Sequence, residues 1–225
     1  MKNQQSGFTL VEIAIVLVII GLLLGGVLKG QELINSARVK NFANDFRNIP
    51  LFIYGYQDRF RALPGDDAAA VAHIPAATPA TTPAGLQGNG VINGNWDTVT
   101  VTDESMLFWQ HVRLAGFASG STVVAANNTY WPNNADGGRI GIESGNSNYI
   151  QNTDGVTFLQ GSYVVCSTGI LGRFALQLDT TMDDGNPQTG SMRVVAVAHA
   201  RGGQGLTTAA IQAAPDAPYT VCMGL

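Results

Sequence analysis

An acidic loop near residue 180 carries the side chains best suited to chemistry. Asp179, Asp183, Asp184 and Asn186 fall within eight consecutive positions that also contain glycine. Carboxylate and amide oxygens are the hard ligands that Ca²⁺ takes in groups of six to eight, so this loop is a candidate calcium site. The spacing does not match the EF-hand pattern, and Asp-Gly and Asn-Pro are common turn formers. A solvated hairpin turn is therefore the competing interpretation.

Other kinds of chemistry find little support. The three histidines lie far apart, and no H-x₃-H, H-E-x-x-H or C-x-x-C spacing is present. A metal-hydrolase site therefore has no basis in the sequence. The chain has a net charge of −4 and only 12% charged residues, without a basic stripe, so nucleic acid is not an expected partner. Weaker acidic patterns occur at Asp66 and Asp67 and in the loop with Asn89, Asn93 and Asp97.

One further carboxylate stands out by its surroundings. Glu12 is the only charged side chain between Phe8 and Leu28. An apolar run of about 20 residues is what a helix needs to cross a bilayer, and an ionisable group inside such a helix is costly and usually has a partner. A cleavable signal peptide fits less well, because the run is too long and contains an acid. A plain membrane anchor fits the length but does not explain the residues around Glu12.

The apolar pattern becomes one-sided beyond Lys29. Apolar residues then recur at spacings of three and four, which predicts that the helix continues to about Arg61 with one buried face. Pro50 should kink this helix rather than end it, since the spacing continues through it. The stripe consists of Val39, Phe42, Phe46, Ile49, Ile53, Tyr56 and Phe60.

The remainder predicts a globular head. A short helix should begin after Thr102 or Asp103 and stop at Gly116. Short alternating or β-branched runs predict strands, the last two forming a hairpin around the acidic loop. The segment from Leu206 to Leu225 is expected to form one helical turn before Cys222 holds it in place. The fold class is therefore α+β, with a long N-terminal helix packed on a head that contains an antiparallel β-sheet. The predicted strands are Arg139–Glu143, Val156–Leu159, Ser162–Cys166, Phe174–Leu178 and Arg193–His199.

A family resemblance lies at the N-terminus. The hexapeptide GFTLVE at residues 7–12, preceded by a polar leader with Lys2 and followed by the apolar run, closely resembles the signal of type IV prepilins and type II secretion pseudopilins. The resemblance implies that a prepilin peptidase cuts after Gly7 and methylates the new amino terminus at Phe8. It also implies that Glu12 pairs with the charged amino terminus of a neighbouring subunit. A buried ion pair of this kind costs far less than either charge alone.

The resemblance also implies a domain organisation and a role. Residues 1–7 would be the leader, residues 8–61 the helix with its transmembrane half at 8–28, and residues 62–225 the head. The expected function is structural rather than enzymatic: a subunit of a type IV pilus-like filament, or alternatively a pseudopilin or minor pilin of a periplasmic pseudopilus. Its partners would be further copies, other pilins, the prepilin peptidase and the inner-membrane assembly platform. An enzyme or receptor merely anchored by the helix is the alternative of a different class.

The expected location is the bacterial inner membrane as a single-pass prepilin, followed by a periplasmic or cell-surface filament. A count of basic residues points the other way, because Lys2 alone precedes the apolar run while Lys29, Arg38 and Lys40 follow it. The leader resemblance is the more specific of the two signals, so the head is expected outside the cytoplasm.

Cys166 and Cys222 are the only cysteines. An even count in an exported head favours a disulfide, and this expectation outweighs a nucleophile–base pair of Cys166 with His199. Calcium sites occur in the heads of some pilins and pseudopilins, which adds to the case for the acidic loop. Calcium is the only cofactor that the sequence suggests.

Overall fold

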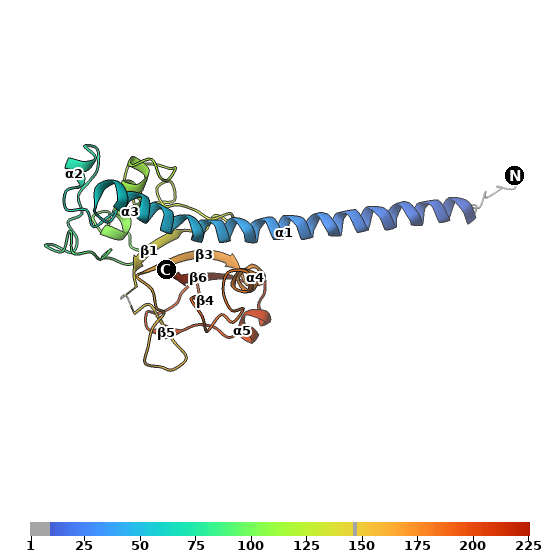
Figure 1. The fold of residues 1–225 in the computed structure, drawn as a ribbon. Helices are drawn as coiled ribbons and strands as arrows, with labels where there is room; N and C mark the ends of the chain where they lie inside the picture. The colour runs from blue at the N-terminus through green and yellow to red at the C-terminus, as the bar shows by residue number, and fades with distance from the viewer. Residues whose placement is uncertain (1–9, 146–147) are drawn as a thin grey trace, which may run out of the picture. The chain divides into compact units, whose positions relative to one another are not determined.

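The computed structural model describes residues 10–145 and 148–225 (Figure 1). The chain divides into two compact units, Met1–Arg38 and Val39–Leu225. Helix α1 (Leu10–Phe60) contributes residues to both units and continues through Pro50. The predicted long helix is therefore confirmed.

Within the first unit, every residue of α1 from Ile13 to Leu28 is apolar. Its large side chains are exposed to the surroundings, with Leu10 at 91% and Leu22 at 73% of their full accessible area. By length and composition α1 could cross a membrane, and it is the one helix of the described residues that meets this criterion. Because a helix with no polar face cannot be stable in water by itself, this segment requires an apolar environment.

In the second unit, α1 buries one stripe of side chains, as the three-and-four spacing predicted. The stripe packs into the main hydrophobic core, where the rings of Phe42 and Phe174 lie 6.4 Å apart. The helix ends at Phe60, and Arg61 adopts a left-handed backbone conformation with φ of 56°. The buried residues are Val39, Phe42, Ala43, Phe46, Ile49, Ile53 and Tyr56.

The core sheet of the head has four antiparallel strands in the order β1-β3-β6-β4. They are β1 (Ile140–Ser144), β3 (Tyr163–Leu171), β4 (Met192–Ala196) and β6 (Pro218–Gly224). Two very short strands, β2 (Ile150–Gln151) and β5 (Gly203–Gln204), pair in parallel. The other helices are α2 (Ala70–His73), α3 (Glu104–Leu114), α4 (Gly172–Met182) and α5 (Thr208–Ala213), of which α4 and α5 lie beside the sheet (Figure 1). This arrangement confirms the α+β fold class.

Strand β6 is central although it follows both of its neighbours in the chain. It pairs with β3 and with β4, and Cys222 lies directly opposite Cys166 of β3. The two cysteines form the expected disulfide, which is fully buried. The disulfide therefore fixes the register of the middle strand pair.

Two predicted strands were wrong, and one strand was missed. Phe174–Leu178 belongs to α4, so the acidic loop joins a helix to β4 and is not a hairpin. Val156–Leu159 is not a strand, and only an isolated bridge joins Phe158 to Gln151. The C-terminal segment forms the expected short helix, α5, and then the strand β6, which was not predicted. In α4 the buried residues Phe174, Ala175 and Leu178 follow helical spacing, which a short apolar run cannot distinguish from strand alternation.

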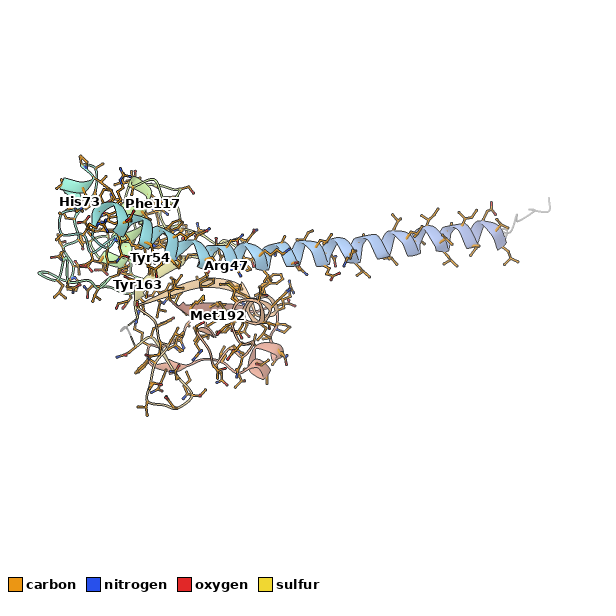
Figure 2. The ribbon with its side chains drawn as sticks, in the orientation of Figure 1. Arg47, Tyr54, His73, Phe117, Tyr163 and Met192 are labelled. Atoms are coloured by element: carbon orange, nitrogen blue, oxygen red, sulfur yellow. A yellow bond between two sulfur atoms is a disulfide. The ribbon has the colours of Figure 1, made fainter. Side chains whose placement is uncertain are left out.

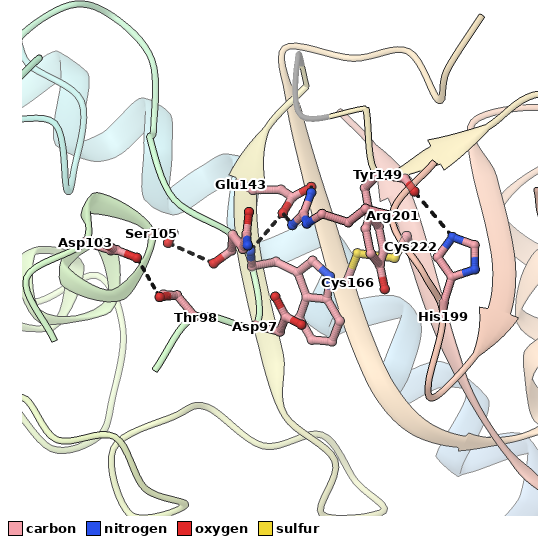
Figure 3. A network of polar contacts seen from close by, with 12 residues as sticks. Asp97, Thr98, Asp103, Ser105, Glu143, Tyr149, Cys166, His199, Arg201 and Cys222 are labelled. Carbon is pink, nitrogen blue, oxygen red and sulfur yellow. Dashed lines mark hydrogen bonds and ion pairs between the residues drawn. A yellow bond between two sulfur atoms is a disulfide. The ribbon is translucent and has the colours of Figure 1, made fainter. Parts of the chain in front are cut away.

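A buried ion pair holds the loops around the sheet (Figure 3). The fully buried carboxylate of Glu143 in β1 accepts from the Arg201 guanidinium at 2.5 Å and from the Trp96 backbone N–H at 2.8 Å. The Arg201 guanidinium also lies 4.8 Å from the centre of the Tyr149 ring. Two segments that are distant in sequence, those with Trp96 and Arg201, are thereby joined to one carboxylate of β1.

The disulfide gives the first testable prediction. The double substitution Cys166→Ala/Cys222→Ala should lower the free energy of unfolding by about 4 kcal/mol, because the bridge closes a loop over a sequence separation of 56 residues. Urea unfolding of the full chain in detergent measures this loss. A double variant as stable as the parent would show that the bridge contributes nothing to the sheet.

Candidate functional site

The N-terminal candidate site is described only in part. Glu12 lies in the first turn of α1. The predicted cleavage and methylation residues Gly7 and Phe8 lie outside the described residues. The structure therefore shows that Glu12 is part of a helix. The processing of the leader stays a prediction.

In the head, the structure brings three of the four predicted calcium residues together where α4 ends. Asp179 and Asp183 are one helical turn apart, and Asp184 follows. One carboxylate oxygen from each of the three residues lies within 4.8 Å of the others. Two oxygens bound to the same Ca²⁺ at 2.3–2.6 Å lie at most about 5 Å apart, so the group has the dimensions of a cation site.

Two of these acids also organise the loop that follows. Asp183 accepts the backbone N–H of Met192 at 2.7 Å, and Asp184 accepts from the Thr189 hydroxyl and from the Asn186 backbone N–H. The amide oxygen of Asn186 accepts the backbone N–H of Gln188 at 3.2 Å. The loop is thus held in place by its own side chains.

Asp179 differs from its neighbours because it is fully buried and both of its carboxylate oxygens lack a hydrogen-bond partner among the described residues. Burial raises the pKa of Asp179 to about 7, and the negative charges of Asp183 and Asp184 add to this effect. Arg193 opposes it, but its guanidinium is already bonded to the carbonyls of Gly190 and Met192 and to Asn152. An unpaired buried carboxylate of this kind requires a proton or a cation.

The weaker acidic patterns, at Asp66 and in the loop with Asn89 and Asn93, have a structural explanation. The buried Asp66 accepts backbone N–H groups from Gly88, Asn89 and Gly90 at 2.6–3.2 Å. Glu104 in α3, also fully buried, accepts both the backbone and the side-chain N–H groups of Asn93. These two carboxylates hold the glycine- and asparagine-rich loop in place of a cation.

The three histidines are separate, as their sequence positions predicted. His111 and His199 each bond to backbone groups. His73, labelled in Figure 2, bonds through Nδ1 to the buried carboxylate of Asp67 at 2.7 Å, and that carboxylate also accepts the Tyr56 hydroxyl at 2.8 Å. His73 and Asp67 line a cavity of about 570 Å³ near the end of α1. No sequence pattern predicts this pair, because its members are joined only by the fold of the loop after α1.

The buried Glu104 predicts a dependence of stability on pH. Burial raises its pKa from 4.5 to about 7, with smaller contributions from Asp66 and Asp103. A carboxyl group whose pKa is higher in the folded state stabilises the fold below pH 4.5, and this contribution is lost as the pH rises through 7. Relative to Glu104→Gln, the wild-type chain should therefore lose up to about 3 kcal/mol between pH 5 and pH 8.

Urea unfolding at a series of pH values measures this difference. Asp154→Asn, which changes an exposed carboxylate, is the control and should retain the wild-type pH dependence. Parallel pH profiles for the wild type and Glu104→Gln would show that Glu104 does not titrate in this range.

Comparison with protein-family models identifies the N-terminal segment. Residues 2–28 match a family model described as the prokaryotic N-terminal methylation motif. No curated protein matches the chain. The matched region contains the hexapeptide at residues 7–12 and the apolar part of α1, and together they fit a prepilin anchored in the inner membrane. The chain therefore carries at its N-terminus the signature of type IV pilins and pseudopilins.

Proposed function

We propose that the chain is a structural subunit of a type IV pilus-like filament. The observation that carries this proposal is the methylation motif at residues 2–28, whose helical part has exposed apolar side chains on every face. Such side chains can leave lipid only by packing with other apolar helices. Assembly with further copies and with other pilins provides that environment, and no enzymatic activity is part of this role.

In this proposal a prepilin peptidase removes residues 1–7 by cutting after Gly7 and methylates Phe8. The transmembrane half at 8–28 holds the processed subunit in the membrane, and residues 62–225 form the head. Glu12 then pairs with the positively charged amino terminus of a neighbouring subunit. The ion pair compensates the cost of a carboxylate in an apolar bundle and sets the register between helices.

Two substitutions separate processing from assembly. Gly7→Ala should block cleavage, while Glu12→Ala should leave cleavage intact and reduce incorporation into sheared filaments to background. Mass spectrometry of the N-terminus reports cleavage and methylation, and immunoblots of sheared filaments report incorporation. Glu32→Ala is the matched control, because it removes an exposed carboxylate of α1 that pairs with Lys29. Normal incorporation of Glu12→Ala would contradict the proposed pairing.

The same motif serves pseudopilins of type II secretion, which form short periplasmic fibres. Shearing distinguishes the two systems, since a pilus subunit is released from the cell surface and a pseudopilin remains with the cell envelope. Retention of the chain in the envelope fraction would favour a pseudopilin or a minor subunit.

We also propose that the head binds a calcium ion at Asp179, Asp183 and Asp184. The observation that favours it is the buried, unpartnered carboxylate of Asp179 beside two further carboxylates. Three ionised carboxylates and the guanidinium of Arg193 leave two net negative charges, which one divalent cation neutralises. Backbone carbonyls or water would complete the six to eight oxygen ligands that Ca²⁺ takes.

A thermal melt of the full chain in detergent tests this site. Calcium at about 100 times its dissociation constant should raise the melting temperature by roughly 5–10 °C over the chelated sample. Asp179→Asn should abolish this rise, whereas the exposed-site control Asp154→Asn should retain it. A wild-type melt that is the same in calcium and in chelator would reject the calcium site.

A further inference from the structure

A second pocket of the head, about 240 Å³ in volume, opens beside the buried face of α1. The residues that line it include two aromatic residues, Phe52 and Trp109, two asparagines, Asn48 and Asn133, and the acidic Asp45. Nδ2 of Asn133 donates to the Asn128 carbonyl, so its Oδ1 is available as an acceptor. Carboxylate, amide oxygen and aromatic faces together form a lining suited to a cation.

The carboxylate of Asp45 has no counter-charge within the described part of the chain. Among the described residues no side chain or backbone group forms a hydrogen bond or ion pair with it. Arg113 also lines the pocket, but its guanidinium is bonded to the carbonyls of Ser119, Ser121 and Tyr130. Partial burial raises the pKa of Asp45 to about 6, as expected for a carboxylate that lacks a cation.

The head unit also contains cations without a partner. Of its described basic side chains, only Lys40 and Arg47 make no ion pair, hydrogen bond or aromatic contact, and both are exposed on α1. Figure 2 labels Arg47 on this helix. At 3.6 residues per turn, Arg47 lies roughly 200° around α1 from Asp45, on nearly the opposite face. The two charges therefore cannot meet within one chain.

We propose that this pocket receives Arg47 of a second copy of the chain, with its guanidinium paired to Asp45. Arginine fits better than lysine, because a planar guanidinium stacks on aromatic rings and donates to several acceptors at once. Such a contact joins one face of α1 in one copy to the opposite face of α1 in the next copy, so the interface is heterologous. Heterologous contacts produce open helical filaments when they do not close into a ring. The inference rests on the proposed filament function and adds to it a specific contact outside the membrane segment.

The test measures subunit stability and filament yield in the same variants. Asp45→Asn keeps the shape of the side chain and should melt at or above the wild-type temperature at pH 8, because it removes an uncompensated carboxylate. Its yield of sheared filaments should fall roughly tenfold, since one partner of a desolvated charge pair is lost. A merely structural role for Asp45 would instead lower the melting temperature and leave the assembly of folded subunits unchanged.

A charge exchange identifies the partner. Arg47→Asp should lose filaments as Asp45→Asn does, and Asp45→Arg/Arg47→Asp should restore them. Asp45→Arg/Lys40→Asp is the matched control and should not restore them. Asp58→Asn, at an exposed carboxylate of the same helix, should leave the yield unchanged.

The outcomes separate the two proposals. Wild-type chains that form no filament would overturn both the filament function and the pocket contact. Wild-type filaments together with a normal yield from Asp45→Asn would overturn the pocket contact alone. Rescue by the Lys40 exchange, or failure of the Arg47 exchange to rescue, would also overturn the assignment to Arg47.

Discussion

Burial of one face of α1 is the constraint on which the head depends. An amphipathic helix of this length cannot stay in water unless another layer covers its apolar stripe. The sheet and α4 provide this layer, and the contact of Phe42 with Phe174 lies within it. The helix stops being apolar on all sides at Lys29, and its buried stripe begins at Val39, the first residue of the head unit. A single helix thus meets the requirements of two different environments.

The acids of the head differ in how their charge is compensated. Glu143 is paired with Arg201, and Asp66 is surrounded by three backbone donors. These two carboxylates stabilise the loops that they join. Asp179 and Asp45 have no such compensation within the described chain. A buried charge without a counter-charge destabilises the fold. A cation from outside the chain would therefore stabilise the head most at these two carboxylates.

The sequence predicted the features that depend on long, regular patterns. The apolar run, the stripe on α1 and the two cysteines gave the helix, its buried face and the disulfide correctly. Short segments were less reliable, since Phe174–Leu178 satisfies both helical and strand spacing. The run Tyr219–Cys222 was missed although aromatic and β-branched residues are typical of strands. The grouping of Asp179 with Asp183 was recognised, but the burial of Asp179 depends on α4, and the pocket at Asp45 depends on loops that only the fold brings together.

The central position of β6 constrains the order of events after synthesis. Strands β3 and β4 do not pair with each other, and each pairs with β6, which comes later in the chain. The sheet therefore cannot close while residues 218–224 are still inside the ribosome or on the wrong side of the bilayer. Sheets with such distant pairings form slowly compared with local structure. Until translocation is finished the head must remain open, and during that interval its exposed strand edges are available to chaperones and proteases of the envelope.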